Sequence, residues 1–323
     1  MRGCKRCHPD FFPVRRSLPG QNSEKGHVEG QELITALLLS SPSSHLTATD
    51  ITAPLIPPQA LSHTSRITSL QTDLTSPEAV ASLLTNRPRF SAIYLLHGIM
   101  SGGAKTNLEL GLAVNLDSHR LILDALRQET SPHRGTVVVF PSSLASSYGT
   151  QKLIIETLLG DYSRRGLLDG RIVRLPTIIV RPGAPSAAAS SFASGIVRES
   201  LKGEENILPV GPELPMWVCS PKTVVKNLVD VKGIPREKFG ISRVLNFPGV
   251  TVTVADILNA LEAVGGTTAR NLVREERSPQ IEAFVGSWPA YFDVSKALGL
   301  GLSQDGDLVT TVKDFAERLR AVV

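Results

Sequence analysis

Short apolar runs alternate with helical segments between residues 30 and 183, and this alternation restricts the fold more than any other feature of the chain. Strand-like runs occupy residues 45–50, 65–70, 92–97, 136–140 and 177–180. Helical patterns occupy residues 32–39, 77–84, 107–128 and 147–163. Alternating strands and helices favour a doubly wound parallel sheet with right-handed crossovers and helices on both faces. The predicted fold class is therefore α/β.

After residue 183 the chain becomes less regular. Residues 184–194 are small and polar, and shorter elements follow at 216–219, 244–247, 253–264 and 308–319. We expect a basic leader at 1–29 and an α/β domain at 30–183, which binds its ligand beyond the carboxyl ends of the strands. A smaller substrate domain is expected at 184–323, with some elements that return to the first domain.

The charge of the chain is concentrated near its N-terminus. The formal net charge is +4 over 323 residues, and residues 1–30 hold six basic and three acidic side chains, so the rest carries only +1. Such a distribution does not form a basic binding face, and no nucleic-acid partner is expected.

Cysteine content and hydropathy bear on the compartment. The three cysteines, Cys4, Cys7 and Cys219, are too few for a disulfide framework and are typical of a reducing compartment. The longest apolar run, 33–39, is too short to cross a bilayer, so no membrane association is expected. We therefore predict a cytoplasmic location.

Tyr148 and Lys152 lie four residues apart at the start of the helical segment that follows the buried run 136–140. This spacing places both side chains on one face of a helix. A phenol has a pKa of about 10 and is a weak base at neutral pH, but a neighbouring ammonium group stabilises the phenolate. With a serine hydroxyl that orients a substrate alcohol, such a pair can accept a proton while a nicotinamide accepts a hydride. The spacing alone is also common in solvated helices.

Several motifs resemble the extended short-chain dehydrogenase/reductases, the NAD-dependent epimerase/dehydratase family. The likeness lies in "SSLASSYGTQK", "LLHGIMSGGA", "VNLDSHR", "WVCSPKTVVKNLV" and "VGSWPAYFD", and it covers about residues 30–323. Within this family the chain is most similar to the D-erythronate dehydrogenase group, whose members are NAD-dependent sugar-acid dehydrogenases. The resemblance implies a Rossmann domain with a small substrate domain, NAD as cofactor, a role in carbohydrate metabolism, and a homodimer formed by paired helices.

The resemblance also implies roles for individual residues. Tyr148 would be the catalytic base, Lys152 would bind the nicotinamide ribose and tune the tyrosine, and Ser143 would orient the substrate. The implied cofactor-binding residues are Gly30, Asp50, Asp73, Leu74, His97, Gly98, Tyr148, Lys152, Pro176 and Thr177. The implied substrate-binding residues, besides Ser143, are Arg181, Ser190 and Ser191.

Three of these residues have simpler explanations that the sequence leaves open. Asp50 at a strand end suits a ribose 2′-hydroxyl and favours NAD over NADP, with a helix or turn cap as the simpler alternative. Asp73 precedes a helical segment and could be its N-cap. Arg181 could bind a carboxylate bidentately or form a surface ion pair.

The chain departs from the family pattern in two places. Before the helix at 32–39 the family has an apolar strand and a G-x-x-G-x-x-G turn, whose glycines let a diphosphate approach the backbone. Here only Gly30 matches, Glu24 and His27 occupy the other two glycine positions, and we predict that the first strand is lost. The loop before the tyrosine helix is also short, because only residues 144–147 separate Ser143 from Tyr148.

Four functional hypotheses follow. The first is oxidation of the C2 hydroxyl of a small sugar acid such as D-erythronate by a Ser/Tyr/Lys mechanism. The second is a nucleotide-sugar epimerase or reductase with the same triad. The third is a non-catalytic remnant that binds NAD weakly. The fourth, nucleotide hydrolysis at residues 98–106, is disfavoured because Ala104 separates the last glycine from Lys105. No metal site is predicted.

Overall fold

The computed structural model describes residues 10–13, 28–85, 87–99, 107–143, 146–183 and 189–320. The chain divides into two compact units. Unit 1 comprises Met1–Arg174 and Leu228–Leu245, and unit 2 comprises Leu175–Asn227 and Asn246–Val323. The boundary predicted after residue 183 therefore falls inside unit 2.

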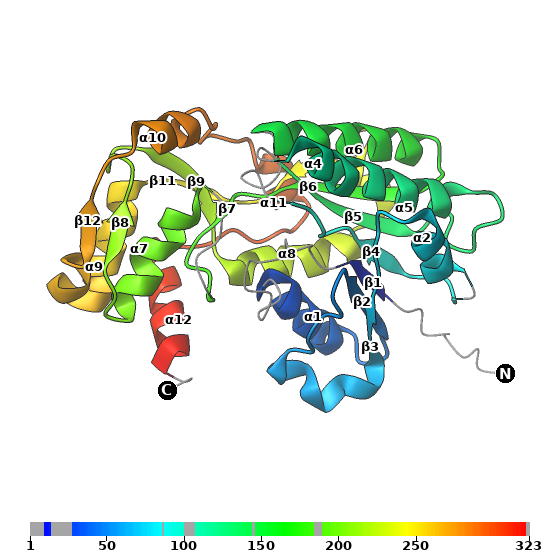
Figure 1. Ribbon diagram of the computed structural model, residues 1–323, viewed down its shortest axis with the longest axis horizontal. Coiled ribbons are helices and arrows are strands. Elements are labelled where there is room, and N and C mark those ends of the chain that lie inside the picture. Colours follow the sequence, from blue (N-terminus) through cyan, green and yellow to red (C-terminus); the bar gives the residue numbers. More distant parts are fainter. Residues whose placement is uncertain are drawn as a thin grey trace. The chain divides into compact units, whose positions relative to one another are not determined.

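Within the described residues, seven strands form the main sheet, in the spatial order β10-β6-β5-β4-β1-β2-β3 (Figure 1). They are β1 (Asp10–Pro13), β2 (Leu46–Asp50), β3 (Ile67–Gln71), β4 (Ala92–Tyr94), β5 (Val137–Ser142), β6 (Asp169–Arg174) and β10 (Val244–Asn246). The neighbours from β3 through β6 pair in parallel. The strand order reverses between β1 and β4, as in a doubly wound dinucleotide-binding sheet. The predicted fold class is confirmed.

The prediction that the first strand is lost is wrong. Asp10–Pro13 forms β1 in the centre of the sheet, where Phe11 pairs with both Thr47 of β2 and Ile93 of β4. The apolar part of this segment is only the dipeptide Phe11-Phe12, followed at once by Pro13, so it shows no strand periodicity. Hydrogen-bond partners on both sides supply the stabilisation that the local sequence lacks. Part of the predicted leader thus belongs to the fold.

Strand β6 was not predicted, and the strand expected at 177–180 is in a different sheet. β6 contains three charged residues, which hid its strand character, yet Arg171 is only 2% exposed. Thr177–Ile178 forms β7, which pairs with β9 in unit 2. Charged side chains that are paired inside the protein therefore misled the prediction.

Helices cover both faces of the main sheet (Figure 1). Those of unit 1 are α1 (Val28–Ser40), α2 (Pro77–Leu84), α4 (Leu108–Leu112), α5 (Ser118–Arg127) and α6 (Ser146–Arg164), with 3₁₀ turns at Pro58–Arg66 and Arg236–Phe239. A buried apolar cluster joins α2, α5 and α6 to strands β4 and β5. α1 lies on the opposite face, and its inner side buries Leu33 and Leu37. The predicted helix at 107–128 is interrupted by a π-helical turn, Ala113–Asp117.

A buried ion cluster attaches residues 228–245 to β6. Arg171 donates to both carboxylate oxygens of Asp169 and, over 2.9 Å, to the carbonyl of Ile234. Its guanidinium lies 4.3 Å from the centroid of the Phe239 ring. Arg243 Nη1 lies 3.6 Å from Asp169 Oδ1, and the Arg243 side chain is 7% exposed. One carboxylate thus balances two buried cations.

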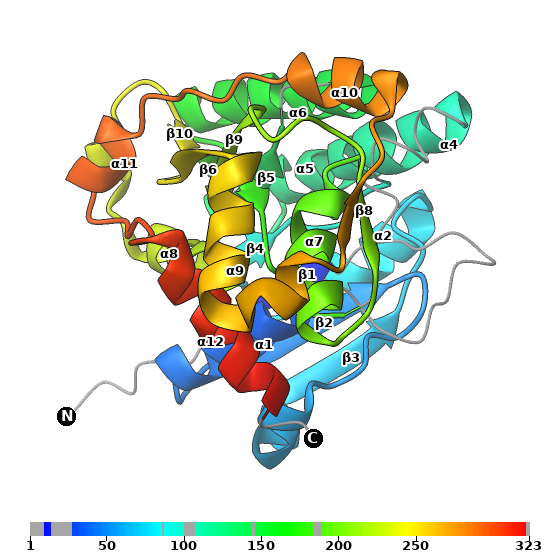
Figure 2. The ribbon, with the colours of Figure 1, turned by 90° about the vertical axis from the view of Figure 1, so that its left-hand side faces the viewer.

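Unit 2 contains two small sheets and a layer of helices (Figure 2). Its strands are β7, β8 (Asn206–Leu208), β9 (Pro215–Cys219), β11 (Val250–Thr253) and β12 (Val273–Glu275). Its helices are α7 (Ser191–Leu201), the first half of α8 (Pro221–Gly233), α9 (Val254–Arg270), α10 (Pro279–Gly286), α11 (Ser295–Gly299) and α12 (Leu308–Arg320). α9 packs against both α7 and α12, and their apolar faces form one core.

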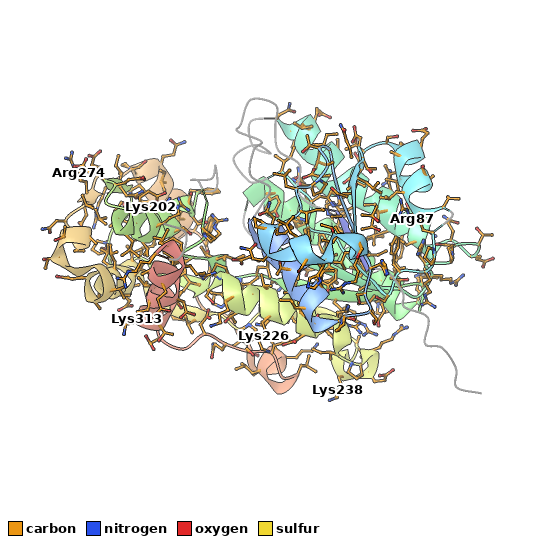
Figure 3. All side chains as sticks on the ribbon, turned by 90° about the horizontal axis from the view of Figure 1, so that it is seen from below. Arg87, Lys202, Lys226, Lys238, Arg274 and Lys313 are labelled. Carbon is orange, nitrogen blue, oxygen red and sulfur yellow. The ribbon has the colours of Figure 1, made fainter. Side chains whose placement is uncertain are left out.

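Figure 3 labels basic side chains from both units: Arg87, Lys202, Lys226, Lys238, Arg274 and Lys313. They come from separate loops and helices and, for Arg274, from strand β12 of unit 2. In the part of the chain that the structure describes, no helix is long and apolar enough to span a bilayer.

Replacing Asp169 by Asn should destabilise unit 1, because both buried arginines lose their counter-ion. We expect the free energy of unfolding to fall by about 3–5 kcal/mol in denaturant titrations. The matched control is Asp161→Asn on α6, which removes more exposed ion pairs to Arg164 and Arg165 and should cost about 0.2–1 kcal/mol. Equal losses in the two variants would show that the cluster does not stabilise unit 1.

Candidate active site

The tyrosine and the lysine singled out in the sequence lie on one face of α6. This helix begins at Ser146, shortly after the end of β5, so its first turn lies at the carboxyl edge of the sheet. Lys152 Nζ lies 5.7 Å from the centroid of the Tyr148 ring and 4.6 Å from that of Phe140 on β5. The ammonium group is therefore held between two aromatic rings.

Lys152 is almost completely removed from solvent, at 1% exposure, whereas Tyr148 is half-buried. A buried ammonium group is costly unless polar groups replace its hydration. Lys152 Nζ donates to the carbonyl oxygen of His97 over 3.5 Å, and the faces of the two aromatic rings add cation–π attraction. The positive charge is thus confined within reach of the phenol.

Gly98 brings backbone against this pair. A Cβ atom at this position would lie 3.7 Å from Tyr148 Cε2, 3.8 Å from Lys152 Cε and only 2.9 Å from Asn115 Oδ1. The last distance is shorter than side chains tolerate, so the close approach requires glycine. The role of Gly98 in binding the cofactor stays a prediction.

Asn115 is a site residue that sequence reasoning missed. It is fully buried in the π-helical turn between α4 and α5. Its Oδ1 accepts from Ile99 N over 2.7 Å, and its Nδ2 donates to Ile99 O and to Gln151 Oε1 over 3.0 and 2.8 Å. It therefore holds the chain next to Gly98 and links it to the neighbour of Lys152. π turns are frequent at functional sites, but the pattern at 107–128 reads as one regular helix.

Ser143 directly follows β5 and is half-buried. The preceding Ser142 is 4% exposed, and its buried Oγ has no hydrogen-bond partner among the residues that the structure describes. Residues 144–145, which connect Ser143 to α6, lie outside the described residues. The role of Ser143 toward the substrate stays a prediction.

The predicted ribose and adenine residues lie at the ends of neighbouring strands. Asp50 ends β2, is 9% exposed, and accepts from the Ile51 N–H over 2.7 Å. Asp73 follows β3 and accepts from both the N–H and the hydroxyl of Thr75. The N-cap of α2 is Ser76, so Asp73 stabilises the turn before the helix rather than capping it. Leu74 packs into the core of unit 1.

Gly30 is buried in the first turn of α1, which follows β1 along the chain. The other glycine positions of the turn, occupied by Glu24 and His27, lie outside the described residues. Residues 100–106, which form most of the segment considered for nucleotide hydrolysis, lie outside them as well.

The remaining predicted residues belong to unit 2. Pro176 is buried, and Thr177 begins β7. Arg181 is half-buried, and its carbonyl accepts from Arg198 Nη1 over 3.1 Å. The residue before it, Val180, has φ of 55°, which is strained for a β-branched side chain. Ser190 and Ser191 lie at the start of α7.

The described residues hold no group of three or more His, Cys, Asp or Glu side chains that could bind a metal ion. Tyr148, Lys152 and Gly98 bring a phenol, an ammonium group and exposed backbone together at this edge of unit 1. These groups can exchange a proton with a substrate hydroxyl.

Comparison with known proteins finds two relatives with the same described activity and a similar solved structure. No family model matches the chain. The chain is 39% identical over 291 residues to a D-erythronate dehydrogenase of Cupriavidus necator, and the matched residues cover 84% of this chain and 87% of the relative. It is also 34% identical over 310 residues to a D-erythronate dehydrogenase of Haemophilus influenzae, and here the match covers 89% of this chain and 95% of the relative. The crystal structure of a nucleoside-diphosphate-sugar epimerase from Agrobacterium tumefaciens superposes with a TM-score of 0.86 at 30% identity, over 99% of this chain and 98% of that one.

Gly98→Ala should disturb the site, because the new methyl group meets Asn115 Oδ1 at a forbidden distance. We expect the free energy of unfolding to fall by about 1–3 kcal/mol, measured by denaturant unfolding. Gly233→Ala, also in unit 1, is the control, because a Cβ there meets no atom within 4 Å. A stable Gly98→Ala protein would show that Asn115 can move away.

The buried histidines should make the fold sensitive to acid. Burial, and secondarily the charge of Lys152, lower the pKa of His97 to about 3, and burial lowers the pKa of His119 well below its usual value. In the unfolded chain these two histidines bind protons as the pH falls through about 6.5, whereas in the folded chain they stay neutral at that pH. Stability is therefore complete above that pH and falls by about 1.4 kcal/mol for each histidine and pH unit below it.

His119→Phe should make the decline of unfolding free energy between pH 6.5 and pH 4 shallower, since one such histidine is removed. His45→Gln changes an exposed histidine and should leave the slope unchanged. An unaltered slope in His119→Phe would contradict the assignment of a neutral buried ring at position 119.

Proposed function

Because the chain belongs to the D-erythronate dehydrogenase family, we propose that it oxidises the C2 hydroxyl of D-erythronate, or of a similar small sugar acid, to a ketone with NAD. The family membership makes it an NAD-dependent oxidoreductase. The observation that carries the proposed mechanism is the buried Lys152 ammonium group 5.7 Å from the Tyr148 ring.

We propose that NAD binds at the carboxyl edge of the unit 1 sheet. Gly98 leaves bare backbone where a Cβ would collide with Asn115, Gly30 lies in the first turn of α1, and the Asp50 carboxylate ends β2. A carboxylate at that strand end bonds a ribose 2′-hydroxyl and repels a 2′-phosphate, which favours NAD over NADP. The residues proposed to hold NAD are Gly30, Asp50, Asp73, Leu74, His97, Gly98, Tyr148, Lys152, Pro176 and Thr177.

NAD, when bound, supplies the acceptor for the hydride that leaves C2 of the substrate. The protein handles the proton. Lys152 stabilises the negative charge on Tyr148 Oη, so the phenolate accepts the hydroxyl proton as the C2–O bond becomes a carbonyl. Ser143 donates a hydrogen bond to the same substrate oxygen and fixes it beside the tyrosine.

Arg181 is proposed to bind the carboxylate of the sugar acid, since its guanidinium suits bidentate contacts. The Arg198 side chain, 2% exposed, bonds the Arg181 carbonyl and pairs with Glu199. This buried support and the strained Val180 fix the backbone that carries Arg181. Ser190 and Ser191 are proposed to bind substrate hydroxyls.

Two alternatives have specific support. The 30% identity to the Agrobacterium epimerase supports a nucleotide-sugar epimerase that uses the same triad. A remnant that binds NAD weakly is favoured by Glu24 and His27 at the glycine positions before α1. Turnover of D-erythronate, but not of UDP-glucose or UDP-galactose, would exclude the first of these alternatives.

We also propose a cytoplasmic homodimer. α6 exposes Leu153 and Ile154 at 41% and 47%, apolar side chains that a second copy would cover. The scarcity of cysteine in the chain fits a reducing compartment.

Tyr148→Phe should reduce kcat for D-erythronate oxidation by at least about 1,000-fold while NAD affinity stays within about twofold, because the base is lost and the ring remains. Isothermal titration with NAD and NADP measures the affinity, and NADH absorbance measures the turnover. Substantial activity in Tyr148→Phe would refute the proposed base. Absence of NAD binding by the unmodified protein would leave the remnant hypothesis standing.

A further inference from the structure

Two buried histidines form a stacked pair beside Lys152. His97 lies just beyond β4, and His119 lies in the first turn of α5. Their ring centroids are 3.9 Å apart with an interplanar angle of 10°, and the two residues are 3% and 0% exposed. The His119 ring meets Phe140 edge-on, at 5.3 Å and 79°. The pair thus adjoins the aromatic ring over which the Lys152 ammonium lies.

The hydrogen bonds around His97 determine its tautomer. Ser118 Oγ lies 2.7 Å from the carbonyl oxygen of Val114, which can only accept, so the serine proton points there. The His97 Nε2 atom lies 2.7 Å from the same Oγ and must therefore carry the proton and donate it. Burial lowers the pKa of His97, so the ring is neutral, and its Nε2–H tethers it to Ser118.

A role in packing alone does not explain the His97 ring. Among the described residues, Nδ1 of His97 is a buried atom without a hydrogen-bond partner. Such an atom costs stability, and a phenylalanine ring would stack there without that cost. The feature that distinguishes His97 from an apolar ring is its Nε2–H tether.

The tether acts on the group that binds Lys152. The carbonyl oxygen of His97 accepts from Lys152 Nζ, and the next residue, Gly98, passes against Tyr148 and the lysine. A ring held by Ser118 and stacked on His119 limits rotation of the peptide that carries this oxygen. The position of the ammonium group therefore depends on a side chain that does not touch the substrate.

Charges near Lys152 come from three elements. Tyr148 and Glu156 precede and follow it by one turn of α6, and Glu156 is paired with Arg174 of β6 over 2.6 Å. His119 faces it from α5 and His97 from the end of β4. Burial keeps the pKa of both histidines below the usual range, so neither adds a positive charge at neutral pH. The two histidines therefore do not oppose the action of the Lys152 charge on Tyr148.

We propose that His97 is a positioning residue for the catalytic pair: its ring, fixed by Ser118 and His119, holds the carbonyl that places the Lys152 ammonium group and so sets the acidity of Tyr148. The inference rests on the proposed function only in treating Tyr148 as the base. It concerns an equilibrium property that can be measured without turnover.

Tyrosinate absorbance provides the test. For each protein, the titration of the corresponding Tyr148→Phe double variant is subtracted, so the difference reports Tyr148 alone among the four tyrosines. His97→Phe keeps a stacked ring but loses the tether, and Ser118→Ala keeps the imidazole but loses its acceptor. Either variant alone suffices if the other does not fold.

The matched control is His133→Phe. His133 is another buried histidine stacked on a phenylalanine, and it bonds Phe90 N and Leu84 O away from Lys152. Its replacement should lower thermal stability without moving the Tyr148 titration. It therefore separates loss of stability from loss of positioning.

We expect the Tyr148 titration to move upward by about one pH unit in His97→Phe and in Ser118→Ala, equivalent to roughly tenfold weaker ionisation. The alkaline rise of kcat/KM should move by the same amount, with activity recovered at high pH. An unmoved titration in a folded variant, or an equal shift in His133→Phe, would overturn the inference. An absence of D-erythronate turnover together with the expected titration shifts would refute the proposed function and leave the inference standing.

Discussion

The structure of unit 1 at the carboxyl edge of its sheet depends on a buried positive charge. Lys152 is 1% exposed, and its ammonium group has lost nearly all hydration. The surroundings compensate with the faces of Phe140 and Tyr148 and with the carbonyl of His97. A charge held in this way acts strongly on a neighbouring phenol, since little water screens it. The same burial that makes the lysine costly makes it effective.

The chain after β4 approaches α6 closely because Gly98 has no side chain and because the buried amide of Asn115 holds the backbone in place. Gly98 gives the clearance, and Asn115 bonds Ile99 on both its N–H and its carbonyl. The π-helical turn that carries Asn115 also contains Val114, whose carbonyl orients Ser118. The π-helical turn therefore supports both the backbone at Gly98 and the side chain of His97, whose carbonyl contacts Lys152.

Ion pairs inside unit 1 explain where sequence patterns misled. β6 reads as a charged segment because Asp169, Arg171 and Arg174 occupy half of it. In the folded protein these side chains neutralise one another or pair with Arg243 and Glu156. β1 was missed for the opposite reason, since its apolar part is only two residues long and its stability comes from β2 and β4 on either side.

The sequence by itself determined the alternating α/β architecture and the common face of Tyr148 and Lys152. Both follow from local periodicity, the first from apolar runs and the second from the helical repeat. Only the tertiary structure decided that β1 is the central strand, that Asn115 and Gln151 join Ile99 to α6, and that His97 and His119 stack beside the lysine. Those contacts join residues far apart along the chain, and no local pattern encodes which distant side chain will compensate a buried charge.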